Sequence, residues 1–176
     1  MTTLHAPGFV LRPFVASDAP AFAAGVCESL STVGKWMPWA TASYTEDEAL
    51  SWFAHCDTCR DHGSAYEFGI FLADGISFVG GAGLNQFNTD HNFCNLGYWV
   101  RESAQRQGAA LAAATTLAQH AFRELGLSRV EIVVAAENTA SFALALKAGA
   151  LHEGLARNRL QLGYNTVSAH IFSLIP

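Results

Sequence analysis

The sequence contains few charged residues, and basic ones are the scarcer kind. Only 14% of its 176 residues are Asp, Glu, Lys or Arg, and 15 acidic residues outnumber 10 basic ones, which gives a formal net charge of −5. A protein whose main task is to bind the phosphate backbone of nucleic acid needs a basic surface. The composition therefore excludes nucleic acid as the expected main partner and favours a cationic or amine-bearing one.

Long apolar runs and abundant cysteine are also missing. No segment approaches the roughly 18 consecutive apolar residues of a membrane span, and residues 1–8 lack the basic segment and apolar run of a signal peptide. Four cysteines are too few to build a fold of this size from disulfides. We therefore expect a protein of the reducing cytoplasm, with no membrane partner.

Apolar residues, by contrast, are plentiful. They make up 51% of the chain and include 12 phenylalanines, so the chain can bury a large core and we do not expect intrinsic disorder. The length is typical of one domain, and neither a repeat nor a linker divides the chain. We expect a single domain over residues 1–176.

The pattern of apolar residues predicts an α/β fold. Alternating or continuous apolar runs predict seven strands, at 9–14, 66–72, 76–86, 93–100, 129–135, 151–162 and 166–174. Capping residues and helical spacing predict four helices, one opening at residues 17–20 and the others at 46–60, 108–125 and 139–147. This order indicates a mixed, largely antiparallel central sheet of about seven strands flanked by about four helices, which lie on both faces.

One Cys-x-x-Cys pair, Cys56 and Cys59, suggests a metal or redox site. A structural zinc site needs four ligands, usually from two such pairs, and a thioredoxin-like motif opens a helix instead of lying late in one. Cys56 continues the helical spacing of Trp52 and Phe53, which favours a small apolar core residue. We expect no metal.

The most informative segment runs from Tyr98 to Ala110, where a strand leads through a short loop into a helix. The first N–H groups of a helix have no partners within it, and the helix dipole makes this end positive. A diphosphate can be held there by main-chain amides, and Gly108 would let the main chain approach it closely.

This segment also resembles a known family. Residues 105–110, Gln-Arg-Gln-Gly-Ala-Ala, fit the Q/R-x-x-G-x-G/A motif of the GNAT superfamily of acetyl-CoA-dependent N-acetyltransferases, and especially its RimJ/RimL-type branch. Further matches lie in order along nearly the whole chain, at residues 11–13, 36–39, 96–100, 138–141, 147–150, 153–154 and 157. Two positions depart from the common pattern: Ala110 replaces a frequent glycine, and Ala150 replaces a frequent phenylalanine.

The resemblance implies acetyl-CoA as cosubstrate and a set of residues that bind it. The strand that ends at Val100 would splay from the one that begins near Arg129, and pantetheine would lie in the gap as an added strand does. The implied contacts are Trp99, Val100 and Asn138 for pantetheine, and Gln105, Arg106, Gln107, Gly108, Ala109 and Ala110 for the diphosphate. Asn138 also suits the N-cap of the following helix.

Two residues are candidates for catalysis. By its motif position, Ser141 would donate a proton to the departing thiolate, whose pKa is about 8.5; the alternative is a plain solvent-facing serine. Glu67 alternates with Tyr66 and Phe68 along a strand and therefore faces away from them. If that face lines the central cleft, Glu67 is the general base or an anionic anchor for the acceptor; otherwise it is a solvated strand residue.

The acceptor itself is less well defined by the sequence. The loop that holds Trp36, Trp39 and Tyr44 would shape the acceptor side, although these rings could equally fasten the loop to the core. A protein or peptide N-terminal α-amine is the first expectation, since its pKa of about 8 leaves it partly neutral at pH 7. The alternatives are a small amine such as a polyamine, an amino acid or an aminoglycoside, and a non-catalytic acyl-CoA-binding module. The oligomeric state stays open, a homodimer included.

Overall fold

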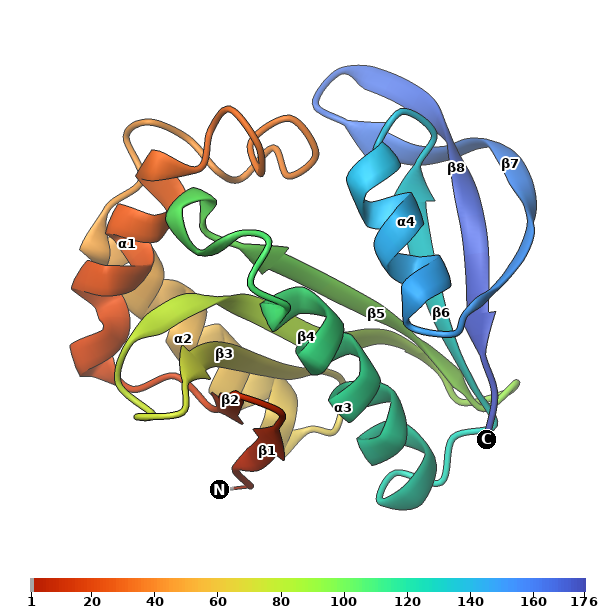
Figure 1. Cartoon of the computed structure of the whole chain (residues 1–176), viewed down its shortest axis with the longest axis horizontal. Coiled ribbons are helices and arrows are strands. Elements are labelled where there is room, and N and C mark those ends of the chain that lie inside the picture. Colours follow the sequence, from red (N-terminus) through yellow and green to blue (C-terminus); the bar gives the residue numbers. More distant parts are fainter. Residues whose placement is uncertain (1) are drawn as a thin grey trace.

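The computed structural model describes residues 2–176 and has one mixed sheet of eight strands in the order β1-β2-β3-β4-β5-β6-β8-β7 (Figure 1). Neighbouring strands pair antiparallel except β5 and β6, which are parallel. The strands are β1 (Leu4–Ala6), β2 (Phe9–Arg12), β3 (Tyr66–Leu72), β4 (Phe78–Asn88), β5 (Phe93–Val100), β6 (Arg129–Ala135), β7 (Leu151–Leu162) and β8 (Asn165–Leu174). The predicted mixed, largely antiparallel sheet is confirmed. The additional strand is β1, whose three residues are too few to show a period.

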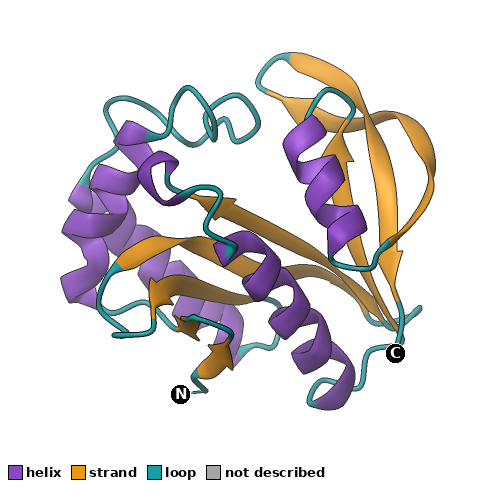
Figure 2. Cartoon of the chain, viewed as in Figure 1, coloured by secondary structure: helices purple, strands orange, loops and turns teal. Residues whose placement is uncertain are grey.

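Four α-helices cover the sheet, as predicted: α1 (Ala19–Glu28), α2 (Glu46–Asp61), α3 (Ala109–Arg123) and α4 (Thr139–Lys147). Helices α3 and α4 lie in front of the sheet and α2 behind it, while α1 stands at the left side of the view and packs against α2 (Figure 1, Figure 2). The capping box predicted for α2 is present, with Glu48 N donating to Thr45 Oγ1 and Thr45 N donating to Glu48 Oε2. No helix in residues 2–176 is long and apolar enough to cross a membrane.

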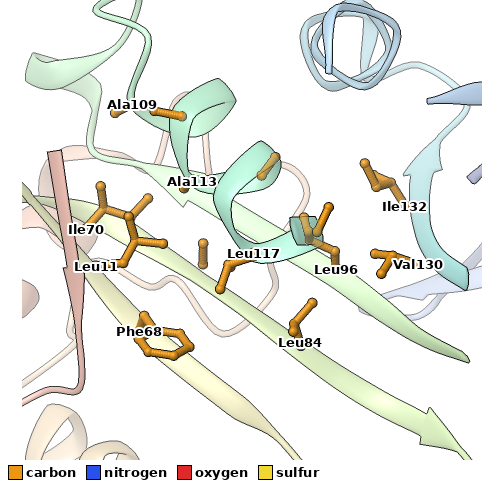
Figure 3. Close-up of a cluster of buried hydrophobic side chains, with 14 of the residues drawn as sticks. Leu11, Phe68, Ile70, Leu84, Leu96, Ala109, Ala113, Leu117, Val130 and Ile132 are labelled. Carbon is orange, nitrogen blue, oxygen red and sulfur yellow. The ribbon is translucent and has the colours of Figure 1, made fainter. Parts of the chain in front are cut away.

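The sheet separates two apolar clusters. The larger lies under α3, where Ala113 and Leu117 pack against Leu11, Ile70 and Leu96 from the strands (Figure 3). The smaller joins α1 and α2 to the opposite face and consists largely of aromatic rings, among them Phe14, Phe22, Phe53, Phe71 and Phe78. Since strand residues alternate between the faces, Phe68 joins the first cluster and its neighbour Glu67 faces the aromatic side.

Cys56 belongs to the smaller core cluster, as its helical spacing predicted, and is only 3% exposed. Burial raises the pKa of its thiol, which makes it a poor nucleophile and a poor metal ligand. All four cysteines are free, and residues 2–176 hold no group of three or more His, Cys, Asp or Glu side chains placed to bind a metal ion.

Candidate active site

Strands β5 and β6 separate shortly after they begin to pair. Their pairing covers only Phe93 with Arg129, Cys94 with Val130 and Asn95 with Glu131, whereas β5 continues to Val100 and β6 to Ala135. Beyond these pairs the facing main-chain groups of the two strands have no strand partner in the described chain. An extended ligand with amide groups can pair with such an edge as an added strand does.

A groove of about 740 Å³ lies at this separation. Its walls include most of the residues that the sequence predicted for the cosubstrate, together with the predicted Ser141: Trp99, Val100, Gln105, Arg106, Gly108, Ala109, Ala110 and Asn138. Gln107 is not part of the wall. Trp36, predicted for the acceptor side, lines this groove instead.

The N-terminus of α3 forms part of the wall of the groove. The first helical hydrogen bond runs from Ala112 N to Gly108 O at 2.9 Å, so the N–H groups of residues 109–111 have no helical acceptor. Gly108, the N-cap, has a φ of 89°, in the left-handed region that favours glycine. Free N–H groups and the positive end of a helix dipole together can bind an anion.

At the other wall of the groove, the first turn of α4 holds Ser141. Asn138 is the N-cap of this helix, and its Oδ1 accepts from Ser141 N at 3.1 Å. The Ser141 hydroxyl lies 2.9 Å from the hydroxyl of Tyr98 on β5. Because burial raises the pKa of Tyr98, the phenol stays protonated near neutral pH and can donate to Ser141 Oγ.

A second cavity, of about 340 Å³, adjoins the groove, and the two share wall residues Met37, Gly97, Tyr98 and Trp99. Aromatic residues contribute much of its wall: Phe14, Phe22, Trp39, Tyr44, Trp52, Tyr98 and Trp99. The ring of Trp39 lies edge-on to Tyr44 and Trp99, with centroids 6.1 Å and 5.7 Å apart. Two residues predicted for the acceptor side, Trp39 and Tyr44, thus line this second cavity, which we call the acceptor cavity.

Glu67 is the acidic residue of the acceptor cavity's wall. Its Oε1 accepts from Asn85 Nδ2 at 3.0 Å, and Asn85 Oδ1 accepts in turn from Asn95 Nδ2 at 2.9 Å. Burial raises the pKa of Glu67, although the hydrogen bond from Asn85 and the nearby Arg60 and His55 oppose this effect. A carboxylate with a raised pKa is a better proton acceptor than an exposed one.

Glycines on β4 make room for the side chains of this cavity. Gly83 pairs with Glu67 and Gly81 with Trp99 across the sheet. A Cβ at Gly83 would overlap the Glu67 carboxylate, and one at Gly81 would lie 2.7 Å from Trp99 Nε1. The run Gly80-Gly81-Ala82-Gly83 is unusual within a strand and often marks a close approach, so it was a signal in the sequence for this cavity.

Sequence reasoning missed two polar residues of the site. Tyr98 was assigned to the strand before the loop, with no role, although its hydroxyl contacts Ser141. Asn85 was read only as part of a strand, although it holds the Glu67 carboxylate. Both contacts join segments that are far apart in sequence, so no local motif could have revealed them.

A groove between splayed strands, with the free N–H groups of a helix N-terminus in its wall and a second cavity that shares wall residues with it, has the features of a transferase that binds a long donor and a separate acceptor. The chain belongs to the GNAT acetyltransferases: a family model described as an acetyltransferase (GNAT) domain matches residues 9–151. It is therefore an acetyltransferase, an enzyme class whose acetyl donor is acetyl-CoA.

Individual relatives agree with this family. A solved structure from Vibrio cholerae, provisionally named a ribosomal-protein-serine acetyltransferase, is 32% identical, covers 99% of this chain and 98% of its own, and has a TM-score of 0.88. RimJ of Mycobacterium smegmatis, solved with a CoA disulfide, is 25% identical over 99% of this chain and 86% of its own, with a TM-score of 0.88. YdaF of Bacillus subtilis (strain 168), provisionally named a ribosomal N-acetyltransferase, is 29% identical over 85% of this chain and 81% of its own.

Proposed function

We propose that this enzyme transfers the acetyl group of acetyl-CoA directly to the N-terminal α-amine of a peptide or protein, with both substrates bound at once. The observation that carries the proposal is the junction of the groove with the acceptor cavity at Gly97, Tyr98 and Trp99. The provisional names of the Vibrio cholerae and Bacillus subtilis relatives support a ribosomal protein as the acceptor, and such an acceptor implies a cytoplasmic enzyme.

The residues of the groove fit acetyl-CoA. The unpaired edges of β5 and β6 match the amides of pantetheine, and the N–H groups of residues 109–111 match a diphosphate. Gln105 fixes the start of this loop, because its Nε2 donates to Val100 O at 3.2 Å. When bound, the thioester supplies an activated acetyl group and a thiolate leaving group.

Two side chains would transfer the protons of the reaction, one from the amine and one to the departing sulfur. A neutral amine is the nucleophile, and an α-amine with a pKa of about 8 needs only a modest base. Glu67, whose pKa is raised by burial, takes the amine's proton directly or through one water. Ser141 donates to the departing sulfur, and Tyr98 holds the Ser141 hydroxyl in place.

The proposal is tested by measuring acetyl-CoA consumption over three sets of acceptors: peptides with free N-termini, polyamines and aminoglycosides. We expect the peptides to give the highest kcat/KM. A preference for polyamines or aminoglycosides would contradict the peptide acceptor but leave the acetyltransferase in place. Binding of acetyl-CoA without turnover on any amine would instead support a non-catalytic binding module.

The role of Glu67 is tested separately with Glu67→Gln, which keeps the shape of the side chain and removes its charge and basicity. If Glu67 is the base, the acidic limb of the kcat/KM profile between pH 6 and 9 should change. If it only anchors the acceptor, KM should rise with little change in kcat. Wild-type kinetics across this range would rule out both roles.

A further inference from the structure

The wall of the acceptor cavity carries charge of only one sign. Within the described chain, residues 2–176, its wall contains Glu67 but no lysine, arginine or histidine. The remaining polar groups are neutral: Asn85, Tyr44 and Tyr98, and the ring nitrogens of Trp39, Trp52 and Trp99. Burial raises the pKa of Tyr44 to about 12, so this phenol adds no charge near neutral pH.

Arg60, whose charge acts to lower the pKa of Glu67, is not part of the cavity wall. Its Nη2 donates to the main-chain oxygen of Glu67, and its guanidinium carbon lies 4.7 Å from the centroid of the Phe68 ring. The Glu67 carboxylate is itself held by Asn85, not by an arginine. An acceptor that entered the cavity would therefore meet the carboxylate and the rings, without a cationic partner.

We propose that the acceptor cavity selects its substrate by charge, with Glu67 as the specificity-determining residue: it accepts α-amines with no anionic group beside the amine and rejects free amino acids and peptides that begin with Asp or Glu. The inference rests on the proposed function and narrows its substrate class. A neutral or cationic first residue is compatible with the wall, because aromatic faces and a carboxylate both attract cations.

The physical reason is the cost of placing a second anion in this cavity. A carboxylate that leaves water for an aromatic cavity loses its hydration and needs a cationic or multiple hydrogen-bonding partner to compensate. The wall offers no cation, and Glu67 would repel the incoming charge at close range. In a free amino acid the carboxylate is attached to the same carbon as the amine, so the two cannot be separated.

Matched peptides give a direct test. Two C-terminally amidated peptides that differ only in Asn or Asp at the first position have nearly the same shape and differ by one charge. Their kcat/KM values are compared at pH 8 and corrected for the neutral fraction of each α-amine. We expect the Asn peptide to be preferred by at least about tenfold, because opposed like charges in an interface strongly disfavour the wrong partner.

Glu67→Gln identifies the cause of this preference, with Glu46→Gln as a control that makes the same change of charge at an exposed position at the start of α2. We expect the ratio between the two peptides to fall in Glu67→Gln, whatever happens to the absolute rates, and to stay unchanged in Glu46→Gln. Equal use of both peptides by the wild type, or an unchanged ratio in Glu67→Gln, would overturn the inference. If neither peptide is acetylated while another amine is, the proposed function itself is wrong.

Discussion

The groove and the acceptor cavity adjoin each other but differ in the kind of group that they present to a ligand. In the groove, the groups that we propose bind the cosubstrate are largely main-chain groups: the unpaired edges of β5 and β6 and the N–H groups at the start of α3. The acceptor cavity is formed by side chains, with aromatic rings from Phe14 after β2, from α1, α2 and β5, and from the 29–45 loop around one carboxylate. Binding in the groove should thus depend mainly on the path of the main chain, and binding in the acceptor cavity mainly on the identity of its side chains.

Because of this difference, the two sites should tolerate different amino-acid substitutions. Main-chain groups are present whatever the side chain, so the proposed contacts with pantetheine and the diphosphate require mainly particular backbone shapes, as at Gly108 with its φ of 89°. A cavity lined by side chains changes its size and charge with each substitution, and such surfaces carry specificity. Relatives that share the groove can therefore differ in acceptor.

Ser141 offers the sharpest test of this difference between main-chain and side-chain contributions, because its N–H and its hydroxyl make separate contacts. Ser141→Ala keeps the N–H that donates to Asn138 at the start of α4 but removes the hydroxyl that we propose donates to the departing sulfur. We expect kcat to fall by about 10²–10⁴-fold, while calorimetry gives nearly the same affinity for acetyl-CoA.

Ser128→Ala, which removes an exposed hydroxyl bonded to Asn92 O, is the control and should leave kcat unchanged. Turnover of Ser141→Ala within error of the wild type would make Ser141 a bystander and assign protonation of the sulfur to water or to another hydroxyl.

The backbone character of the groove is tested by Gly108→Val. A β-branched residue in the left-handed region costs about 1–2 kcal/mol, and the N-cap must shift to relieve it. We expect the dissociation constant of acetyl-CoA to rise by about tenfold, since 1.4 kcal/mol corresponds to that factor.

Gly126→Val is a matched control at the opposite end of α3. Gly126 has a φ of 66°, and a Cβ at either glycine meets no atom within 4 Å, so both variants should lose similar stability. Only Gly108→Val should lose affinity in a calorimetric titration. Equal affinities in the two folded variants would contradict the placement of the diphosphate.

Tyr98→Phe tests the contact that links the two regions. The ring remains, but the hydroxyl 2.9 Å from Ser141 Oγ is lost. One hydrogen bond is worth about 0.5–1.5 kcal/mol, so we expect kcat to fall about twofold to tenfold in steady-state assays, with little change in the KM for acetyl-CoA.

Tyr164→Phe, at the fully exposed β7–β8 turn, should have no effect on kcat. In the double variant Tyr98→Phe/Ser141→Ala, the Tyr98 substitution should add almost nothing, because it acts through Ser141. Additive losses would show that Tyr98 has an independent role.

The smallest expected effect is on stability, and it depends on pH. Because burial raises the pKa of Glu67 in the folded state, the folded protein binds this proton more tightly than the unfolded chain does. The resulting stabilisation is complete below the unfolded pKa and is lost as the pH rises through the folded one. Arg60 and His55 oppose the shift, and the Cys56 thiol beside them stays neutral because its own pKa is raised.

Glu67→Gln cannot ionise, so its free energy of unfolding relative to the wild type should be higher at pH 8 than at pH 5. Urea unfolding at the two pH values measures this difference, and Glu46→Gln provides the control. If the difference in the free energy of unfolding stays constant or falls with rising pH, ionisation of Glu67 does not destabilise the folded protein.

The same difference between main-chain and side-chain contacts explains which features of the fold and the site the sequence could predict. Strands β5 and β6 and helix α4 have the predicted bounds, because their apolar patterns and caps are local. Strand β4 begins later than the predicted Ile76, since Asp74 Oδ1 accepts from Ile76 N and Ser77 N and thereby extends the turn. The anion site at α3 was predictable from one segment.

The acceptor cavity was less predictable, because its contacts join distant segments. Alternation along β3 did indicate that Glu67 faces away from Phe68, but not that Asn85 and Asn95 would form a chain of hydrogen bonds to it. Trp36 and Trp39 were both predicted for the acceptor side, yet Trp36 lines the groove and Trp39 lines the acceptor cavity. The direction of a side chain in an irregular loop depends on packing that a sequence pattern does not encode.

The central claim, that the enzyme acetylates N-terminal α-amines, is tested most directly with one peptide that offers two amines. A peptide with a free N-terminal serine and one internal lysine is incubated with acetyl-CoA and enzyme at pH 7, and tandem mass spectrometry locates the acetyl group. We predict that the acetyl group is on the α-amine, because a lysine amine with a pKa of about 10.4 is almost fully protonated at this pH. Acetylation mainly at the lysine would contradict the claim.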